Sequence, residues 1–255
     1  MHAGYATGPA CTRRRSPARR RLEAAPASAP GTDAARLWAH YDRAMYGSGD
    51  GHFHVFRRAL NWEPFEGGAG RSVHVEAVLG ASADKVWQAL TTPEVLTVWL
   101  GEVTGHLCEG GHFALAGNAS GSIHACEPRT RICLDWDFGG GHSGVEVRLT
   151  PSGHRCEVTL INSMPESTLE TDEHWLTYGP AASGVGWESV LFGLHHYLLT
   201  GEALDEEAWV ASREGREFIE ASAAVWADVH ISTGADEAAA RAAADRTRAF
   251  YLGEE

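Results

Sequence analysis

Three side chains in this sequence have the chemistry and the setting for proton transfer beside an apolar interior: His124, Glu188 and His195. An imidazole changes its protonation state near neutral pH, and a carboxylate does so when apolar surroundings raise its pKa. His195 borders the apolar stripe of a predicted helix, and Glu188 lies in the first turn of that helix, where the helix dipole stabilises a carboxylate. His124 lies in a predicted strand whose register stays open, because Cys126-Glu127-Pro128 is compatible with a bulge. The three residues are candidates for general acid–base catalysis, and each also fits a structural or solvated role.

Other groups with catalytic potential stand in contexts that argue against such a role. Asp135, Asp137, Glu146 and Glu157 alternate with apolar residues along predicted strands, so they face solvent on the polar side of a sheet. The sequence contains no nucleophile triad, phosphate-binding loop or dinucleotide fingerprint. The glycine-rich segment Ser183–Gly186 follows a predicted loop and not a strand, and we interpret it as a hinge into the next helix. We therefore expect no cofactor.

One metal-binding constellation needs to be weighed, because His106, Cys108 and His112 are close in the sequence. His106 and Cys108 would share one face of a strand. A fourth ligand at a regular spacing is missing, and 14 histidines are distributed along the chain, so scattered surface histidines are the favoured interpretation. The five cysteines show no C-x-x-C spacing, which indicates free thiols in a reducing cytoplasm. We expect no metal site.

The hydrophobic pattern indicates which elements position these groups. A strand is predicted over residues 71–79, and a series of strands separated by glycine- and proline-rich turns follows between residues 101 and 163. Two short helices lie between them: Ser82 caps the first, and Thr92-Pro93-Glu94 opens the second. The strands carry apolar residues on one face, and a predicted helix over residues 185–199, ended by Gly201, has an apolar stripe that can cover this face. Further helices are predicted toward the C-terminus.

The distribution of charge excludes some partners. Residues 1–36 contain seven arginines and two acidic residues, whereas the rest of the chain contains 14 basic and 32 acidic residues. The acidic remainder of the chain, residues 37–255, repels phosphate backbones. Only residues 1–36, which we call the basic arm, could bind nucleic acid. The arm is rich in Ala, Pro, Ser and Arg, which predicts disorder, and no apolar segment follows its arginines as in a secretory signal. The most apolar run, Val190–Leu199, is too short and too interrupted to span a bilayer. We expect a cytoplasmic protein that binds neither nucleic acid nor membranes.

The order of the elements, together with short sequence motifs within them, resembles the SRPBCC superfamily of START and birch-pollen-allergen-like proteins. The resemblance is strongest to its co-chaperone-like branch, named for activators of a heat-shock-protein ATPase, and covers about residues 71–201. Phe218, Ser222, Trp226 and residues 249–251 also resemble an extension of some bacterial members. At Asn162 many members carry a histidine, so this position stays polar but cannot shuttle protons. The motifs are Ala83–Leu90, Thr92–Glu94, Glu109–Phe113, Gly121–Ile123 leading to Cys126–Pro128, Leu134–Trp136, Val158–Leu160 and Gly186–Glu188.

The resemblance implies an α+β helix-grip fold, in which a curved antiparallel sheet wraps around a long C-terminal helix and extra C-terminal helices follow. It divides the chain into a disordered arm (1–36), an aromatic- and glycine-rich extension (37–70), the helix-grip domain (71–201) and a helical C-terminal extension (202–255). Whether the last helices cap a cavity or form a homodimer stays open.

The resemblance further implies a largely apolar internal cavity that binds a hydrophobic small molecule. An enzyme of this kind would act without a cofactor as a polyketide cyclase or aromatase, a lyase or isomerase that folds its substrate and moves protons in a desolvated cavity. The alternative is a non-catalytic, co-chaperone-like module that binds proteins through its surface. The lining implied for the cavity, in which large aromatic side chains suit a flat apolar guest, is Trp99, Phe113, Leu134, Trp136, Leu160, Asn162, Trp187, Leu191 and Leu194.

Overall fold

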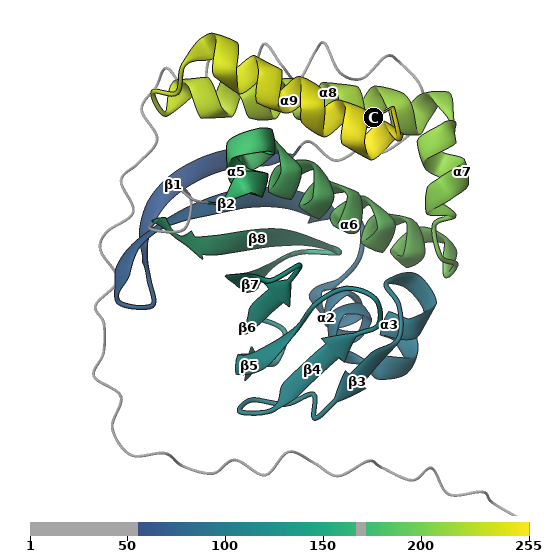
Figure 1. Cartoon of the computed structure of the whole chain (residues 1–255). Helices are drawn as coiled ribbons and strands as arrows, with labels where there is room; N and C mark the ends of the chain where they lie inside the picture. Colours follow the sequence, from purple (N-terminus) through teal and green to yellow (C-terminus); the bar gives the residue numbers. More distant parts are fainter. Residues whose placement is uncertain (1–55, 167–171, 255) are drawn as a thin grey trace, which may run out of the picture. The chain divides into compact units, whose positions relative to one another are not determined.

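An antiparallel sheet of eight strands forms the centre of the structure (Figure 1). The structure is a computed structural model that describes residues 56–166 and 172–254, all of them within one unit that comprises residues 51–255. The strand order is β1-β2-β8-β7-β6-β5-β4-β3. The strands are β1 (Arg57–Phe65), β2 (Gly68–Leu79), β3 (Val103–Gly105), β4 (His112–Leu115), β5 (Ser120–Glu127), β6 (Arg131–Phe138), β7 (Gly141–Ser152) and β8 (Arg155–Pro165).

The sheet has one apolar face and one polar face, as the alternation of the sequence predicts. We call the face that the long helix α6 (Pro180–Thr200) covers the inner face and the opposite one the outer face. Val73 and Val75 of β2 and Val158 of β8 are fully buried on the inner face. The mixed α+β architecture with a curved antiparallel sheet confirms the expected fold class.

The sheet begins before residue 71, where the sequence pattern had placed its first strand. β1 and β2 form a hairpin whose two loop residues, Glu66 and Gly67, have φ values of 50° and 82°. Two left-handed residues give a hairpin loop a twist that matches the strands. Charged residues and Pro64 interrupt the apolar alternation of β1, which hid this strand in the sequence. The arm and residues 37–55 lie outside the described residues.

Two short helices follow β2, as predicted. α2 (Ala83–Thr91) begins after Ser82, whose side chain accepts a hydrogen bond from the amide of Lys85 at 3.4 Å. α3 (Pro93–Trp99) begins with a proline, which suits the first helical position because its missing N–H would have no partner there. The remaining helices are α5 (Glu173–Tyr178), α6, α7 (Glu206–Ala211), α8 (Arg213–Ser232) and α9 (Glu237–Leu252). Among the described helices, none is long and apolar enough to cross a membrane.

The long helix α6 ends as predicted but begins earlier. Gly201 adopts the left-handed conformation at its C-terminus, with φ 78°. The helix starts at Pro180 and not at residue 185, so Glu188 lies in its third turn and not in its first. The segment Ser183–Gly186 is therefore helical, and its interpretation as a hinge is wrong.

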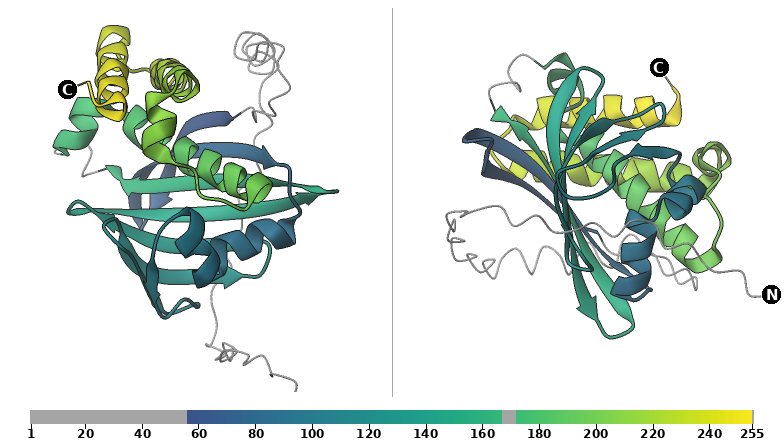
Figure 2. Two further views of the ribbon diagram at one scale, coloured as in Figure 1. Left: turned by 90° about the vertical axis from the view of Figure 1, so that its right-hand side faces the viewer. Right: turned by 90° about the horizontal axis from the view of Figure 1, so that it is seen from below.

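The C-terminal helices lie on the side of α6 that faces away from the sheet, where α8 and α9 form an outer layer (Figures 1 and 2). Two glycines of α6 allow α8 and α9 to approach the backbone of α6 closely. A Cβ atom on Gly184 would overlap the indole ring of Trp226 from α8. A Cβ atom on Gly186 would lie 2.6 Å from the hydroxyl of Tyr251, which donates a hydrogen bond to the carbonyl of Ala182. These glycines form the surface on which α8 and α9 dock.

We predict opposite effects for two glycine-to-alanine substitutions in α6. Gly184→Ala should lower the free energy of unfolding by about 1–3 kcal/mol, because the new methyl group overpacks against Trp226. Gly193→Ala is the control: its Cβ meets no atom within 4 Å, so alanine should raise the helix propensity and stabilise the protein by about 0.5–1 kcal/mol. Urea unfolding measures both. Equal effects of the two substitutions would contradict the docking of Trp226 on Gly184.

Candidate functional site

Three aromatic side chains meet on the inner face at the far end of the sheet from β1. Phe113 of β4 lies with its ring centroid 5.9 Å from that of Trp136 of β6. Trp136 in turn contacts Trp187 of α6 in an edge-on arrangement, with the centroids 5.0 Å apart. All three residues belong to the lining that the sequence predicts, and the fold brings them together. We call Phe113, Leu134, Trp136 and Trp187 the aromatic face.

Leu134, Trp136 and Trp187 of the aromatic face are less completely covered than two inner-face residues beside them. Val145 and Leu160, from the neighbouring strands β7 and β8, are 4% and 3% exposed. Leu134 and Trp136 point to the same side of the sheet but are only half-buried, as is Trp187 above them. The reason is the position of α6, which packs mainly against β2 and leaves the β6 part of the face farther from a helix. Apolar surface therefore remains accessible where these aromatic rings meet.

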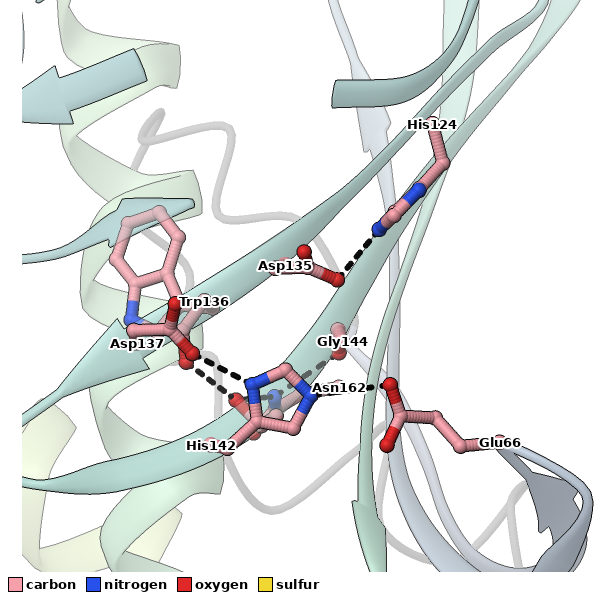
Figure 3. Close-up of polar contacts among 9 residues, drawn as sticks. Glu66, His124, Asp135, Trp136, Asp137, His142, Gly144 and Asn162 are labelled. Atoms are coloured by element: carbon pink, nitrogen blue, oxygen red, sulfur yellow. Dashed lines mark hydrogen bonds and ion pairs between the residues drawn. The ribbon is translucent and has the colours of Figure 1, made fainter. Parts of the chain in front are cut away.

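A polar side chain lies beside the aromatic face. Asn162 of β8 is 4% exposed, and its amide donates to the hydroxyl of Ser143 at 3.1 Å and to the carbonyl of Gly144 at 3.2 Å (Figure 3). The Ser143 hydroxyl donates to the carbonyl of Trp136. This chain of hydrogen bonds fixes the backbone of β6 and β7 next to the tryptophan.

The other predicted lining residues have different surroundings. Leu160, Leu191 and Leu194 are almost fully buried and belong to the main core between the sheet and α6. Trp99 is half-buried and its indole nitrogen donates to the carbonyl of Ala89, which links α3 to α2. These residues therefore pack in or near the core, and the accessible apolar surface belongs to the aromatic face.

Glu188, a catalytic candidate from the sequence, points away from Trp136 toward β1 and α8. Its carboxylate is completely buried and accepts from Arg58 twice, from Nε at 2.6 Å and from Nη2 at 2.7 Å. Ser222 and Trp226 of α8 donate to the same carboxylate at 2.9 and 2.7 Å. We call these four residues the Glu188 network. Its hydrogen bonds join β1, α6 and α8 at a distance from the aromatic face.

The Glu188 network places a charged carboxylate inside the protein, where it needs a counter-charge and hydrogen-bond donors. A buried charge is costly to desolvate, and its cost is offset only when an opposite charge and hydrogen bonds occupy its acceptor sites. The bidentate geometry of Arg58 and the two donors from α8 meet that requirement. The C-terminal helix α8 thus contributes directly to satisfying a charge inside the domain.

We predict that removing Arg58 is strongly destabilising. In Arg58→Met the Glu188 carboxylate keeps its two donors from α8 but loses its counter-charge, which should cost about 3–5 kcal/mol in the free energy of unfolding. Urea unfolding followed by circular dichroism measures this loss. In the control, Arg213→Met removes the exposed partner of Glu217 on α8 and should leave the urea midpoint unchanged. An Arg58→Met protein as stable as the native chain would contradict the role of the network.

The two histidine candidates also differ in position. The bulge of β5 lies between Ile123 and Ala125, not after Cys126, and it brings His124 to Asp135 on the outer face. The His124 Nε2 and Asp135 Oδ1 atoms are 2.5 Å apart (Figure 3). His124 is therefore on the opposite side of the sheet from Trp136. His195 is half-buried on α6 next to Leu194.

A second histidine–carboxylate cluster joins the β1–β2 hairpin to β7 on the outer face. His142 contacts Asp137 at 2.5 Å through Nδ1 and Glu66 at 3.3 Å through Nε2 (Figure 3). The hydrogen bond with Asp137, and then that with Glu66, raise the pKa of His142 above its ordinary value of 6.5, although partial burial opposes the shift. The imidazole of His142 bridges the carboxylates of Glu66 in the hairpin loop and Asp137 on β6.

We predict a pH-dependent contribution of His142 to stability. Because its pKa is raised in the folded state, the stabilisation is fully present below about pH 6.5 and is lost as the pH rises through the higher folded-state value. His142→Gln should therefore lower the melting temperature near about pH 5.5 and have little effect near about pH 9. The effect is below about 1 kcal/mol because the imidazole is partly solvated. A larger effect at high pH would contradict the assignment.

His154→Gln provides the control for this measurement. His154 is exposed in the turn between β7 and β8 and has no carboxylate partner among the described residues. Its replacement should not change the difference between the two melting temperatures.

Two arginines that the sequence did not single out are prominent on the inner face: Arg58 in the Glu188 network and Arg71 near α5. Both lie in or next to the β1–β2 hairpin, which the pattern did not predict. The signal that could have revealed Arg58 is the presence of Glu188 within an apolar helix, because a buried carboxylate needs a cation.

Comparisons with known proteins give consistent results. The family model of "Activator of Hsp90 ATPase homolog 1-like protein" matches residues 80–199. A crystal structure of CalU16 from Micromonospora echinospora is 30% identical, with a TM-score of 0.55, over 69% of this chain and 98% of CalU16. A solution structure of CalU16 is 29% identical, with a TM-score of 0.57, over 74% of this chain and 100% of CalU16. DynU16, from the dynemicin biosynthetic locus, is 24% identical over 51% of this chain, with a TM-score of 0.42. No curated protein matches the chain.

Proposed function

Because the chain belongs to the Activator of Hsp90 ATPase homolog 1-like family, an SRPBCC-type family, we propose that it binds a hydrophobic small molecule on its aromatic face. The family match and the likeness to CalU16 support a helix-grip protein of the ligand-binding kind. The proposal for this chain goes further and names the surface that receives the ligand, between α6 and the strands β4 and β6.

The observation that carries this proposal is the half-buried contact between Trp136 and Trp187 on the apolar face of the sheet. Apolar side chains in the middle of a sheet face are ordinarily packed until water is excluded. Partial exposure of two tryptophans there leaves apolar surface whose burial by a guest would be favourable. Flat apolar molecules pack favourably against tryptophan rings.

Two of the three catalytic candidates have polar partners away from the aromatic face, which limits the chemistry available there. Glu188 is engaged in its network, and His124 pairs with Asp135 on the outer face. A cyclase-like activity would therefore depend on holding the substrate in a reactive conformation, with His195 as the remaining candidate for proton transfer. Binding and orientation of an apolar guest are the part of that activity that the described residues support.

The alternative is a protein-binding module, as the name of the family suggests. Such a module would act through its surface and would not need accessible tryptophans beneath a helix. The two functions differ in a property that can be measured: only the first requires that a small apolar molecule bind at the aromatic face.

We predict that 2-naphthamide, a neutral and flat apolar probe, binds the purified protein and quenches its tryptophan fluorescence. Trp136→Leu and Trp187→Leu should each weaken binding by about tenfold, because each removes an aromatic contact and part of the buried area. Isothermal titration calorimetry measures the affinities.

Ile219→Ala is the matched control for loss of stability. Ile219 is 1% exposed and lies on α8, in the layer beyond α6, so its replacement destabilises the core without touching the aromatic face. It should bind 2-naphthamide with native affinity. Absence of binding to the native chain, or equal loss in all three variants, would overturn the proposed function.

A further inference from the structure

Arg71 lies on the inner face of the sheet, near the N-terminal end of β2. It pairs with Trp62 of β1 and with Met164 of β8. Residues two apart on a strand share a face, so Arg71 is on the same side as Val73, whose side chain is completely buried under α6. An arginine in this position brings a permanent positive charge to the apolar side of the sheet.

The guanidinium of Arg71 is held by aromatic rings and not by acceptors. Its central carbon lies 3.7 Å from the ring centroid of Trp62 and 5.9 Å from that of Trp175 on α5. Its Nε atom is buried and has no hydrogen-bond partner. Within the described ranges, 56–166 and 172–254, no hydrogen bond or ion pair of this side chain is found. A buried guanidinium N–H, such as that of Nε here, ordinarily has an acceptor.

Arg71 differs from Arg58 in that no carboxylate of the described residues accepts hydrogen bonds from its guanidinium. Arg58, on the same hairpin, is bidentate to the Glu188 carboxylate. Glu166 is the acidic residue whose charge acts on Arg71, but it forms no ion pair with it within 4.0 Å. Desolvation lowers the pKa of Arg71, with the charge of Glu166 opposing, which agrees with a cation that lacks a contact partner. Arg71 thus has the donors of a carboxylate site without the carboxylate.

The sheet register relates Arg71 to the aromatic face. Arg71 pairs with Met164, Gly144 pairs with Ser163, and Trp136 pairs with Ser143. Arg71 and Trp136 are therefore in the same row on the same face, separated by β8 and β7. Three strand spacings put their backbones about 14 Å apart. The guanidinium lies against Trp62 of β1, on the other side of β2 from Trp136, so its charge is not brought closer to that ring. A molecule that contacts both must therefore be elongated.

We propose that Arg71 binds the carboxylate of an elongated apolar ligand whose body rests on the aromatic face. The inference depends on the proposed function and specifies its ligand as a hydrophobic carboxylic acid. The rings of Trp62 and Trp175 hold the planar guanidinium in one orientation, so the edge of the fork is prepared for the two oxygens of a carboxylate. The apolar surroundings strengthen this charged interaction.

The test compares 6-(2-naphthyl)hexanoate with its neutral amide, 6-(2-naphthyl)hexanamide, by isothermal titration calorimetry on the full chain. The native protein should bind the acid about ten- to a hundredfold more tightly than the amide, as expected for a hydrogen bond between charged groups. Arg71→Gln should abolish this preference while leaving the affinity for the amide unchanged. Arg71→Lys keeps the charge without the planar fork and should retain part of the preference.

The control is Arg155→Gln, which removes an exposed arginine of β8 and should preserve the preference. Equal affinities of the native protein for acid and amide, or a preference that survives in a folded Arg71→Gln protein, would overturn the role of Arg71 and leave apolar binding intact. Failure of both probes to bind the native protein would overturn the inference together with the proposed function. Thermal unfolding of each variant establishes that it is folded.

Discussion

The buried ion pair between Arg58 and Glu188 is the interaction on which the arrangement of the domain depends. A carboxylate with no exposed surface is tolerable inside a protein only if its counter-charge and donors are held in place. Those groups come from β1 and α8, which flank α6 from different layers. The pair therefore fixes where the long helix lies on the sheet, and it makes the C-terminal helices part of the same core.

This position of α6 divides the inner face into two parts. Over β2 the helix packs closely, and the side chains of Val73, Val75 and Leu160 are buried. Over β6 the helix is farther away, and Trp136, in contact with Phe113 and Trp187, stays half-buried. A helix held firmly to one half of a curved sheet leaves apolar surface accessible at the other half. In our account, the same constraint that stabilises the fold creates the surface for a ligand.

The features that the sequence predicted are those that depend on local pattern. The alternation of apolar and polar residues predicted which face of the sheet each side chain of β6 to β8 occupies. Ser82 and Pro93 marked the starts of α2 and α3, and Gly201 marked the end of α6. The aromatic residues that meet on the inner face were also predicted, because the resemblance supplied their place in the fold. Local pattern cannot identify a partner such as Arg58, which is 130 residues from Glu188 along the chain.

The features that the sequence missed share a physical cause. β1 has an irregular pattern because one side of it carries Arg58 and Trp62, which contact Glu188 of α6 and Arg71 of β2. Glycines 184 and 186 indicated flexibility when read alone, but within α6 they are required by the side chains of two distant helices. Arg71 gave no signal, since nothing in its sequence neighbourhood distinguishes a half-buried arginine without an acceptor from an exposed one. Only the packing of segments far apart in the sequence reveals these roles.

The most direct test of this account is a titration followed by the indole N–H resonances in a nitrogen-15 correlation spectrum, with 2-naphthamide as the probe. We predict that the resonances of Trp136 and Trp187 shift and saturate together, while that of Trp226, bonded to Glu188, stays in place. A saturating titration that moves the resonance of Trp226 and leaves those of Trp136 and Trp187 unchanged would contradict the account.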